Sequence, residues 1–530
     1  MTTIPEIELP VVEGPPGRAA ILAEPHATSS ATHSSAFGSV ARGAVALLLT
    51  QPVTWAASLL SLAVVPHVLG PTVFGEVALV GAVSTLATAC VCMGIPDFLQ
   101  RQVASHPESI HEDGWSALTL AVFSAMVLSI VLLLLLPRLG LPVPRVLLLI
   151  ALAGVVVGAA WRVLGGLFLG QERYSAYALL TAATSAISTF PAVCVLLLSH
   201  SVVAFMLVPL TVAVLVSLYG WMRFGIRPSR SATSLGRWRW LALAGLPFGA
   251  ATVTVTLYGS IDSVLLGFLS RAEVVGWYAA AYRVISIPVF IPALIATPLF
   301  PTLSRLNRDQ DTFRQTTNRS LIAVMYATIP LCAMIIALAP SIPRLLHWAP
   351  GFEHSVLLMQ ILALHEPLVG VDMVLVTAVL ASHREHRWLL VTACLALINP
   401  SVNGFAVPLF EHFAHNGAIG AAIATVATEA LAFLAALRLL PPGTLHRRSL
   451  TVALRVALAS GPLFVVAEAL RPYSLPAAGV AAGVSYIGAG FLLRIWTLAE
   501  LGMAWRLIQN TLQSRFRSLL ASRQERASSV

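Results

Sequence analysis

Long apolar blocks recur along this chain from residue 43 to residue 496, and they limit its fold more than any other feature. Each block is about 18 to 28 residues long, which suits an α-helix crossing the roughly 30 Å apolar core of a bilayer. Only 10% of the residues are charged, whereas soluble domains carry about 25%. We place fourteen spans, at residues 43–66, 74–98, 115–136, 146–169, 176–199, 202–222, 241–269, 275–300, 320–340, 355–380, 388–410, 417–438, 449–470 and 475–496.

The predicted fold class is an all-α integral membrane protein with about fourteen transmembrane helices. A helix satisfies its own backbone hydrogen bonds in lipid, so uninterrupted apolar blocks favour helices. The alternation of polar and apolar residues that marks a membrane barrel is absent.

Arginine placement predicts that both termini are cytoplasmic. With the amino terminus inside, the inner loops and tails hold most arginines, as the positive-inside rule requires. The outer loops hold only five, which are Arg138, Arg145, Arg271, Arg344 and Arg471. The arginines that give the formal charge of +9 are therefore distributed as in a membrane protein, and we expect no nucleic-acid partner.

The chain repeats itself weakly, which divides it into two lobes. LLLTQPVTWAASLL from Leu47 resembles LALAGLPFGAATVTV from Leu241, and each copy is followed by a glycine-containing turn. We expect two pseudo-repeated lobes with the substrate path between them, followed by two extra helices. The expected segments are a disordered tail (1–40), an N-lobe (41–222), a basic linker (223–240), a C-lobe (241–440), two helices (441–496) and an amphipathic basic tail (497–530).

Two stretches carry a resemblance to a known family. The segments VLGPTVFGEVAL (68–79) and MGIPDFLQRQVA (93–104) look like the first two helices of Wzx-type polysaccharide and O-antigen flippases. The block from IDSVLLGFLSRAEVVGWYAAAYR to LFPTLSRL (261–306) resembles the second-lobe pattern of the same group. These proteins belong to the multidrug/oligosaccharidyl-lipid/polysaccharide flippase superfamily.

The resemblance implies translocation of undecaprenyl-diphosphate-linked oligosaccharide across a bacterial cytoplasmic membrane by alternating access. It implies a lipid-linked oligosaccharide as substrate, membrane lipids as surroundings, and a polysaccharide polymerase and chain-length regulator as possible partners. The alternatives are a cation-coupled multidrug exporter of the same superfamily and a lipid II flippase. A membrane polysaccharide polymerase or ligase fits less well, because such enzymes use a long outer loop.

Charged and polar residues inside the spans are the candidates for a substrate site, because they rarely face lipid. Asp262 and Arg283 are expected to line a cavity between the lobes, with Arg283 binding a phosphate through its planar fork. Either residue can instead form a buried ion pair, and Asp262 can take part in ion coupling. Three more cavity candidates lie in the first span: Arg42, Gln51 and Trp55.

Three other acids are candidates for ion coupling: Glu366, Asp372 and Glu429. Pro288 and Pro292 are predicted to bend the eighth span, either as a hinge or as a fixed kink.

Neither enzyme nor cofactor motifs stand out. Asp309 and Asp311 form a DxD-like pair, but they lie in an arginine-rich loop that is typical of a solvated surface. The five cysteines all fall within predicted spans, and we expect no disulfide, no metal site and no cofactor. The chain is predicted to be a transporter and not an enzyme.

Overall fold

The structure is a computed structural model. It describes residues 29–224, 233–445 and 447–495, without the side chains of residues 29–51 and 447. Every regular element in these ranges is a helix. The α-helices are α1 (Ser29–Cys92), α2 (Ile95–Ser105), α3 (Ile110–Leu135), α4 (Arg145–Gly170), α5 (Tyr174–Ser199), α6 (Val202–Phe224), α7 (Leu235–Leu269), α8 (Ala272–Ser286), α9 (Phe290–Leu306), α10 (Gln310–Leu338), α11 (Ile342–Leu345), α12 (Ser355–Ala363), α13 (His365–Ala381), α14 (Glu385–Ala414), α15 (Gly417–Leu439), α16 (Arg447–Leu470) and α17 (Leu475–Leu492).

The described ranges contain 12 helices that are long and apolar enough to cross a membrane, or 13 if the bent pair α8 and α9 counts as one. In that number α1 counts once, although it consists of two helices joined at Gly70. Gly70 has φ 69° and ψ 172°, a backbone conformation that suits only glycine. If the bent pair counts as one span and the two arms of α1 count separately, the number of crossings is fourteen, as predicted.

Three predicted boundaries need correction. Residues 29–40, expected to be disordered, already belong to α1, because extending a helix needs no new nucleation step. The expected basic linker ends early, since α7 begins at Leu235. The second predicted span stops at Cys92, because Met93 and Gly94 have positive φ and a separate helix, α2, follows. The rest of the amino-terminal tail and the carboxy-terminal tail from residue 496 lie outside the described residues.

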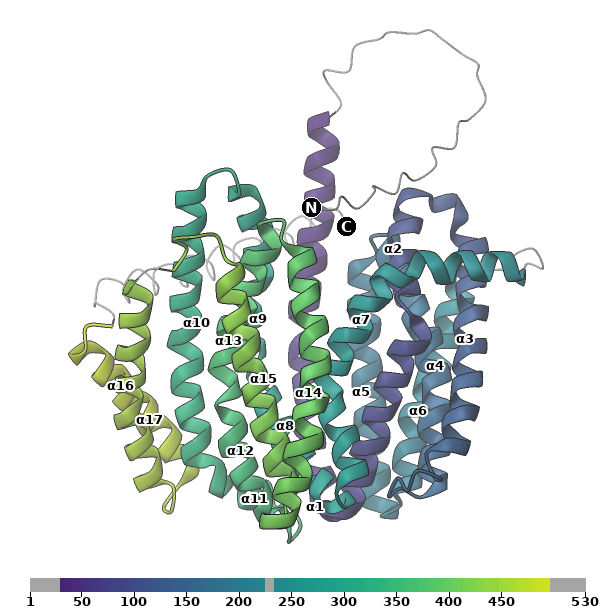
Figure 1. The fold of residues 1–530 in the computed structure, drawn as a ribbon. Coiled ribbons are helices and arrows are strands. Elements are labelled where there is room, and N and C mark those ends of the chain that lie inside the picture. Colours follow the sequence, from purple (N-terminus) through teal and green to yellow (C-terminus); the bar gives the residue numbers. More distant parts are fainter. Residues whose placement is uncertain (1–28, 225–232, 446, 496–530) are drawn as a thin grey trace, which may run out of the picture.

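The helices form two groups joined by long central helices (Figure 1). In one group α4 packs on α2, α3 and α6, and α5 packs on α1 and α6. In the other, α13 packs on α9, α10 and α15, and α14 packs on α15 and α7. The helices α16 and α17 pack on each other and on α10 at the outer edge of the second group.

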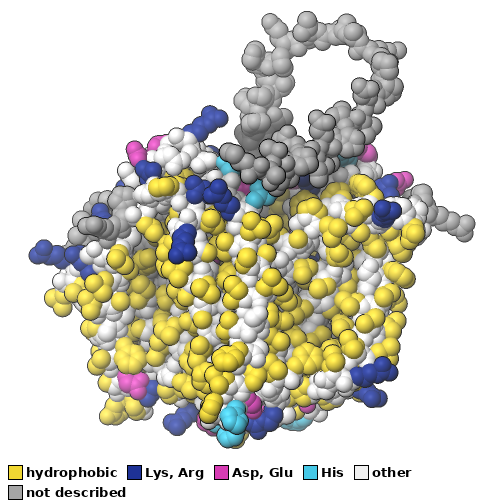
Figure 2. All heavy atoms as spheres, in the orientation of Figure 1, with side chains coloured by type: hydrophobic (Ala, Val, Ile, Leu, Met, Phe, Trp, Pro, Cys, Tyr) yellow, Lys and Arg dark blue, Asp and Glu magenta, His cyan; other side chains and the backbone are white. Residues whose placement is uncertain are grey.

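Large apolar side chains cover the sides of this bundle, as Figure 2 shows, and charged side chains gather toward its two ends. Leu198, Leu397 and Phe405 are 86%, 73% and 72% exposed. Such a continuous apolar belt is unfavourable in water and is stable against lipid tails. The chain is therefore a multi-pass membrane protein.

Two glycines bring α1 and α8 into backbone contact at the end of the bundle where α1 reverses. A Cβ added to Gly75 in α1 would lie 1.8 Å from the Ala272 carbonyl oxygen, and one added to Gly276 in α8 would lie 2.0 Å from the Pro71 carbonyl oxygen. We call this contact the glycine crossing.

At the opposite end a second close approach joins α2 to α7. A Cβ on Gly249 would lie 2.4 Å from the Met93 carbonyl oxygen. Close by, the Thr252 hydroxyl donates to Asp97, with 3.2 Å between the oxygens. The two groups of helices therefore touch near both ends, and polar side chains lie between these contacts.

Candidate functional site

A cavity of about 540 Å³ lies between α1, α5 and the junction of α8 with α9. We call it the central cavity. Its polar wall comes from one arginine, one tryptophan and five hydroxyl groups, supplied by Arg283, Trp55, Ser58, Ser61, Ser185, Thr189 and Ser286. The Trp55 ring packs on Phe290, with 4.2 Å between ring centroids. Cationic, aromatic and hydroxyl groups thus face one space inside the apolar bundle.

Among the side chains that the structure describes, Arg283 is the only charged one that lines this cavity. It lies eleven residues after the start of α8, which is about 17 Å along the helix axis and near the centre of a bilayer core. The guanidinium carbon lies 5.0 Å from the centroid of the Phe74 ring, a cation–π contact. Within the described residues no carboxylate lies within ion-pair distance of it, so its hydrogen-bond donors are available to a ligand.

A break between α8 and α9 shapes the floor of the central cavity. The two helices meet at 52°. Pro288 lies between them, and Pro292 lies in the first turn of α9. Each lacks the N–H that a continuous helix would use, which explains the predicted bend. The break turns Arg283 and Phe290 toward the same space, on opposite sides of the junction.

Two candidates from the first span cannot be placed. Arg42 and Gln51 lie on α1, but their side chains are outside the described residues. Trp55, one turn beyond Gln51, is therefore the described side chain that places this part of α1 against the cavity.

Asp262 does not pair with Arg283, which corrects one of the two predicted roles. Its side chain is 6% exposed and lies inside a cluster built from four helices. The Tyr278 hydroxyl donates to Oδ2 at 3.0 Å, the Thr425 hydroxyl donates to Oδ2 at 2.7 Å, and the Asn403 amide donates to Oδ1 at 2.9 Å. Asp262 is absent from the lining of the central cavity, because these donors turn its carboxylate toward α14 and α15.

Replacing Asp262 by alanine is expected to lower the free energy of unfolding by about 3 kcal/mol, because three buried donors lose their acceptor. Thermal or denaturant unfolding of the purified chain in detergent measures this. Asp97→Ala is the matched control. Asp97 is exposed and accepts only the bond from Thr252, so a loss below about 1 kcal/mol is expected. Equal losses of unfolding free energy in the two variants would show that the buried cluster stabilises the fold no more than the exposed hydrogen bond between Thr252 and Asp97 does.

A second cavity, of about 480 Å³, lies among α7, α8, α9, α13, α14 and α15. We call it the acidic cavity. Glu429 accepts a hydrogen bond from the Tyr258 hydroxyl at 2.7 Å, and its carboxylate lies 3.8 Å from His365 Nε2. Asp372 lines the same space and has one buried oxygen, Oδ1, without a hydrogen-bond partner.

Two of the three predicted coupling acids, Asp372 and Glu429, thus meet in one cavity. Glu366 does not line it, although it is fully buried and both of its carboxylate oxygens lack a partner. Because Glu366 and Asp372 are six residues apart on α13, they point to different sides of the helix.

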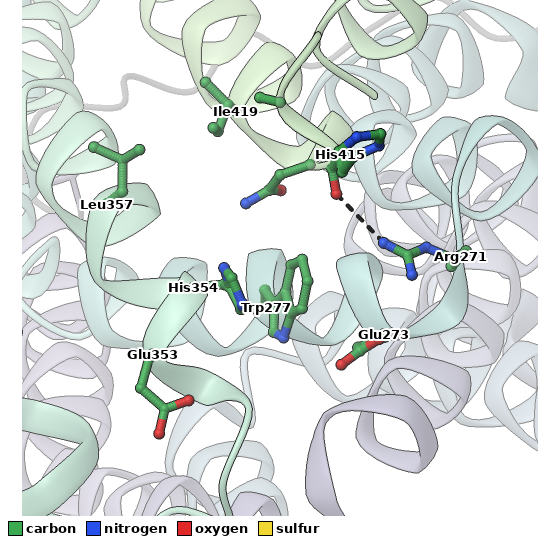
Figure 3. A pocket seen from close by; sticks show the side chains of 10 residues that line it. Arg271, Glu273, Trp277, Glu353, His354, Leu357, His415 and Ile419 are labelled. Carbon is green, nitrogen blue, oxygen red and sulfur yellow. Dashed lines mark hydrogen bonds between the residues drawn. The ribbon is translucent and has the colours of Figure 1, made fainter. Parts of the chain in front are cut away.

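A third cavity, of about 500 Å³, lies near the α7–α8 and α14–α15 corners. Figure 3 shows Trp277 and His354 side by side at its edge, with 4.3 Å between their ring centroids. Arg271 donates to the His415 carbonyl oxygen at 3.3 Å and pairs with Glu411. These contacts tie the corners together next to the glycine crossing.

Sequence reasoning missed the partners of the buried acids. Asn399 and Asn403 are two amides four residues apart in an otherwise apolar stretch, and that spacing is a readable signal. The sequence gives no comparable signal for Tyr258, Tyr278 or Thr425, because tyrosine and threonine are common in membrane helices.

The DxD-like pair has a structural role. Asp309 is the N-cap of α10 and accepts from the Thr312 backbone N–H and hydroxyl. These hydrogen bonds lower the pKa of its carboxyl below the usual range. Asp311 pairs with Arg314, at 3.5 Å.

Comparisons with known proteins agree with the motifs. The sequence model of the family described as "Polysaccharide biosynthesis protein" matches residues 40–307. The probable flippase AglR of Haloferax volcanii is 27% identical over 301 residues, which cover 53% of this chain and 57% of that protein. The chain therefore spans little more than half the length of this relative.

Solved structures with the same fold include a lipid II flippase MurJ in an inward closed conformation. It gives a TM-score of 0.62 and 14% identity, and the match covers 84% of this chain and 99% of that chain. An inward-facing multidrug resistance MATE family transporter of the MOP superfamily gives a TM-score of 0.55 and 17% identity. That match covers 74% of this chain and 94% of the transporter. The predicted all-helical fold is confirmed.

The relative and the two solved structures are described as a probable flippase, a lipid II flippase and a multidrug transporter. The family match covers just over half of the chain, from residue 40 to residue 307. The chain therefore belongs to the polysaccharide biosynthesis protein family.

Proposed function

We propose that this protein moves undecaprenyl-diphosphate-linked oligosaccharide units across the cytoplasmic membrane for the synthesis of cell-surface polysaccharide. The observation that carries the proposal is the central cavity, where the unpaired cation of Arg283 faces hydroxyl groups and an indole inside an apolar bundle.

Each part of such a substrate finds suitable chemistry there. The diphosphate binds Arg283, because a guanidinium offers parallel donors to phosphate oxygens. Sugar hydroxyls bind Ser58, Ser61 and Thr189, and a sugar face stacks on Trp55. The polyprenyl tail stays in the lipid, so the pocket needs to hold only the polar part.

Alternating access follows from the proposed division into an N-lobe (41–222) and a C-lobe (241–440). The central cavity draws its lining from both, with α1 and α5 on one side and α8 and α9 on the other. The close approaches near the two ends of the bundle then act as gates that open in turn. The break at Pro288 and Pro292 is the proposed hinge, since it leaves carbonyls without a helical partner and weakens α8–α9 at that point.

We propose that the end bearing α2 and the start of α7 faces the cytoplasm. The arginine-rich loops and helix ends meet there, including Arg305, Arg384 and Arg438. Released units would then reach the outer leaflet, where a polymerase and a chain-length regulator are the expected partners.

The acidic cavity is the proposed coupling site. Asp372 and Glu429 face one space with Tyr258 and His365, and buried carboxylates bind protons or small cations readily. The same cavity favours the alternative function, a cation-coupled drug exporter, because its acids lie beside Tyr282 and Trp388.

Deleting the gene tests the substrate. Lipid-linked oligosaccharide is expected to accumulate in the inner leaflet and to clear when the wild-type gene is restored. Leaflet-specific enzymatic labelling of the glycan measures the distribution. An unchanged distribution in a strain without a second flippase, together with increased sensitivity to cationic drugs, would favour the exporter.

Vesicles reconstituted with the purified protein test the coupling. An imposed proton or sodium gradient is expected to drive flipping by wild type but not by Glu429→Gln, because glutamine cannot exchange a charge. Glu468→Gln is the control, since Glu468 forms a local pair with Arg471 on α16, away from the cavity. A Glu429→Gln variant that responds fully to both gradients excludes the acidic cavity as the coupling site.

A further inference from the structure

The largest of the cavities described here lies away from the central cavity, between α10, α16 and the end of α17. Its volume is about 1070 Å³. We call it the arginine cavity. It is lined by Gln315, Asn318, Arg319, Ile322, Ala323, Tyr326, Arg448, Ser449, Thr451, Val452, Arg455, Arg494 and Ile495.

Four arginines and no acid line this space: Arg319, Arg448, Arg455 and Arg494. None of them forms an ion pair with a described residue. Arg455 makes a single long hydrogen bond, from Nη1 to the Arg494 carbonyl oxygen at 3.4 Å. Four like charges around one cavity repel one another, and a bound anion would reduce that repulsion.

Hydrogen bonds between helices fix the segments that carry these arginines. The Ser449 hydroxyl donates to Asn318 at 2.6 Å, which joins α16 to α10. The Tyr326 hydroxyl donates to the Ile495 carbonyl oxygen at 3.1 Å, which fixes the end of α17 against α10. Arg494 itself has a φ of 52°, which ends the helix and turns the chain there. Contacts between helices therefore position the backbone segments that carry the four exposed arginines.

The depth of the cavity points to an amphiphilic ligand. Arg448 and Arg455 are seven residues apart on one face of α16, so the cations extend over about 10 Å along the membrane normal. Apolar side chains of Ile322 and Val452 line the space between the charges. The neighbouring outer face of α16 exposes large apolar side chains, namely Leu450, Leu454 and Leu458.

The cavity also lies at the edge of the bundle, where α16 and α17 are the outermost helices (Figure 1). A ligand can therefore enter from the lipid phase and keep its acyl chains against the apolar face of α16. Basic pockets between transmembrane helices suit lipid phosphates for this reason.

We propose that the arginine cavity binds the headgroup of an anionic phospholipid. The phosphate lies among Arg319, Arg448, Arg455 and Arg494, and the acyl chains follow α16 into the bilayer. The bound lipid holds α16 and α17 on α10. This site is separate from the central cavity and does not depend on what the protein transports.

Native mass spectrometry of the full chain tests the proposal, with phosphatidylglycerol and phosphatidylcholine as probes. Wild type is expected to bind phosphatidylglycerol at least about tenfold more tightly, since each basic residue adds to the attraction of an anionic lipid. The triple variant Arg319→Gln/Arg448→Gln/Arg455→Gln is expected to lose that preference. Arg438→Gln is the matched control, because Arg438 is an exposed arginine near the end of α15 that does not line the cavity.

Three outcomes would overturn the proposal. The first is equal binding of the two lipids by wild type. The second is an unchanged preference in the triple variant. The third is full displacement of phosphatidylglycerol by about 10 mM inorganic phosphate, which would show a site for soluble anions. If the triple variant does not fold, Arg455→Gln and Arg455→Lys give the same readout, and lysine is expected to restore part of the preference.

Discussion

Arg283→Gln is expected to reduce transport of the lipid-linked oligosaccharide about thirtyfold. The variant loses a charged pair of hydrogen bonds to the diphosphate, worth about 2 kcal/mol, and about 1.4 kcal/mol corresponds to a factor of ten. No other described residue that lines the central cavity is charged, so no described neighbour replaces Arg283. Arg283→Lys keeps the charge but loses the planar fork, and a smaller loss of about fivefold is expected. Flipping in reconstituted vesicles measures both.

Arg173→Gln controls for the loss of the aromatic contact. The Arg173 guanidinium lies 5.8 Å from the centroid of the Phe224 ring, much as Arg283 lies over Phe74. Arg173 does not line the central cavity, so its loss is expected to leave transport nearly unchanged. Comparable transport by Arg283→Gln and wild type, at equal amounts of folded protein, would exclude Arg283 as the phosphate ligand.

The fold was largely predictable because lipid imposes a length on every crossing. Apolar blocks of the right size became helices almost everywhere. The errors occurred at local backbone signals, such as Met93–Gly94, where positive φ angles end one helix and begin another. The proline-rich eighth span was correctly predicted to bend, but a proline removes a donor without setting an angle. The 52° between α8 and α9 depends on packing against α1, α12 and α13.

The acids of the site were predictable and their partners were not. A carboxylate in an apolar block is costly, so Asp262 and Glu429 stood out. Their partners come from distant helices: Asn403 and Thr425 are 141 and 163 residues from Asp262. An ion pair between Asp262 and Arg283 was one of the two alternatives for these residues. Hydrogen bonds from neutral donors satisfy the carboxylate instead, and this leaves the arginine free for a ligand.

Gly276→Val is expected to reduce transport at least about tenfold by preventing closure at the glycine crossing. The added Cβ would lie 2.0 Å from the Pro71 carbonyl oxygen, which is backbone and cannot rotate away. Overpacking of this kind costs about 1 to 3 kcal/mol. In the proposed alternating-access cycle only the state closed at this end contains the contact, so the cost shifts the population toward the state that is open there. Gly75→Val is expected to do the same, because a Cβ at Gly75 would lie 1.8 Å from the Ala272 carbonyl oxygen on the other side of the contact.

Labelling of a single cysteine reports this shift directly. Ser61→Cys, placed in a chain without the five native cysteines, puts a thiol in the central cavity. A membrane-impermeant maleimide added from the side of the glycine crossing is expected to react several-fold faster in Gly276→Val. Gly404→Val is the control, because no atom lies within 4 Å of a Cβ added at Gly404. If Gly276→Val transports normally and its labelling rate matches that of Gly404→Val, the crossing is a static packing contact. If labelling rises while transport falls, the backbone contact between α1 and α8 is a gate, and the two glycines are what allow it to close.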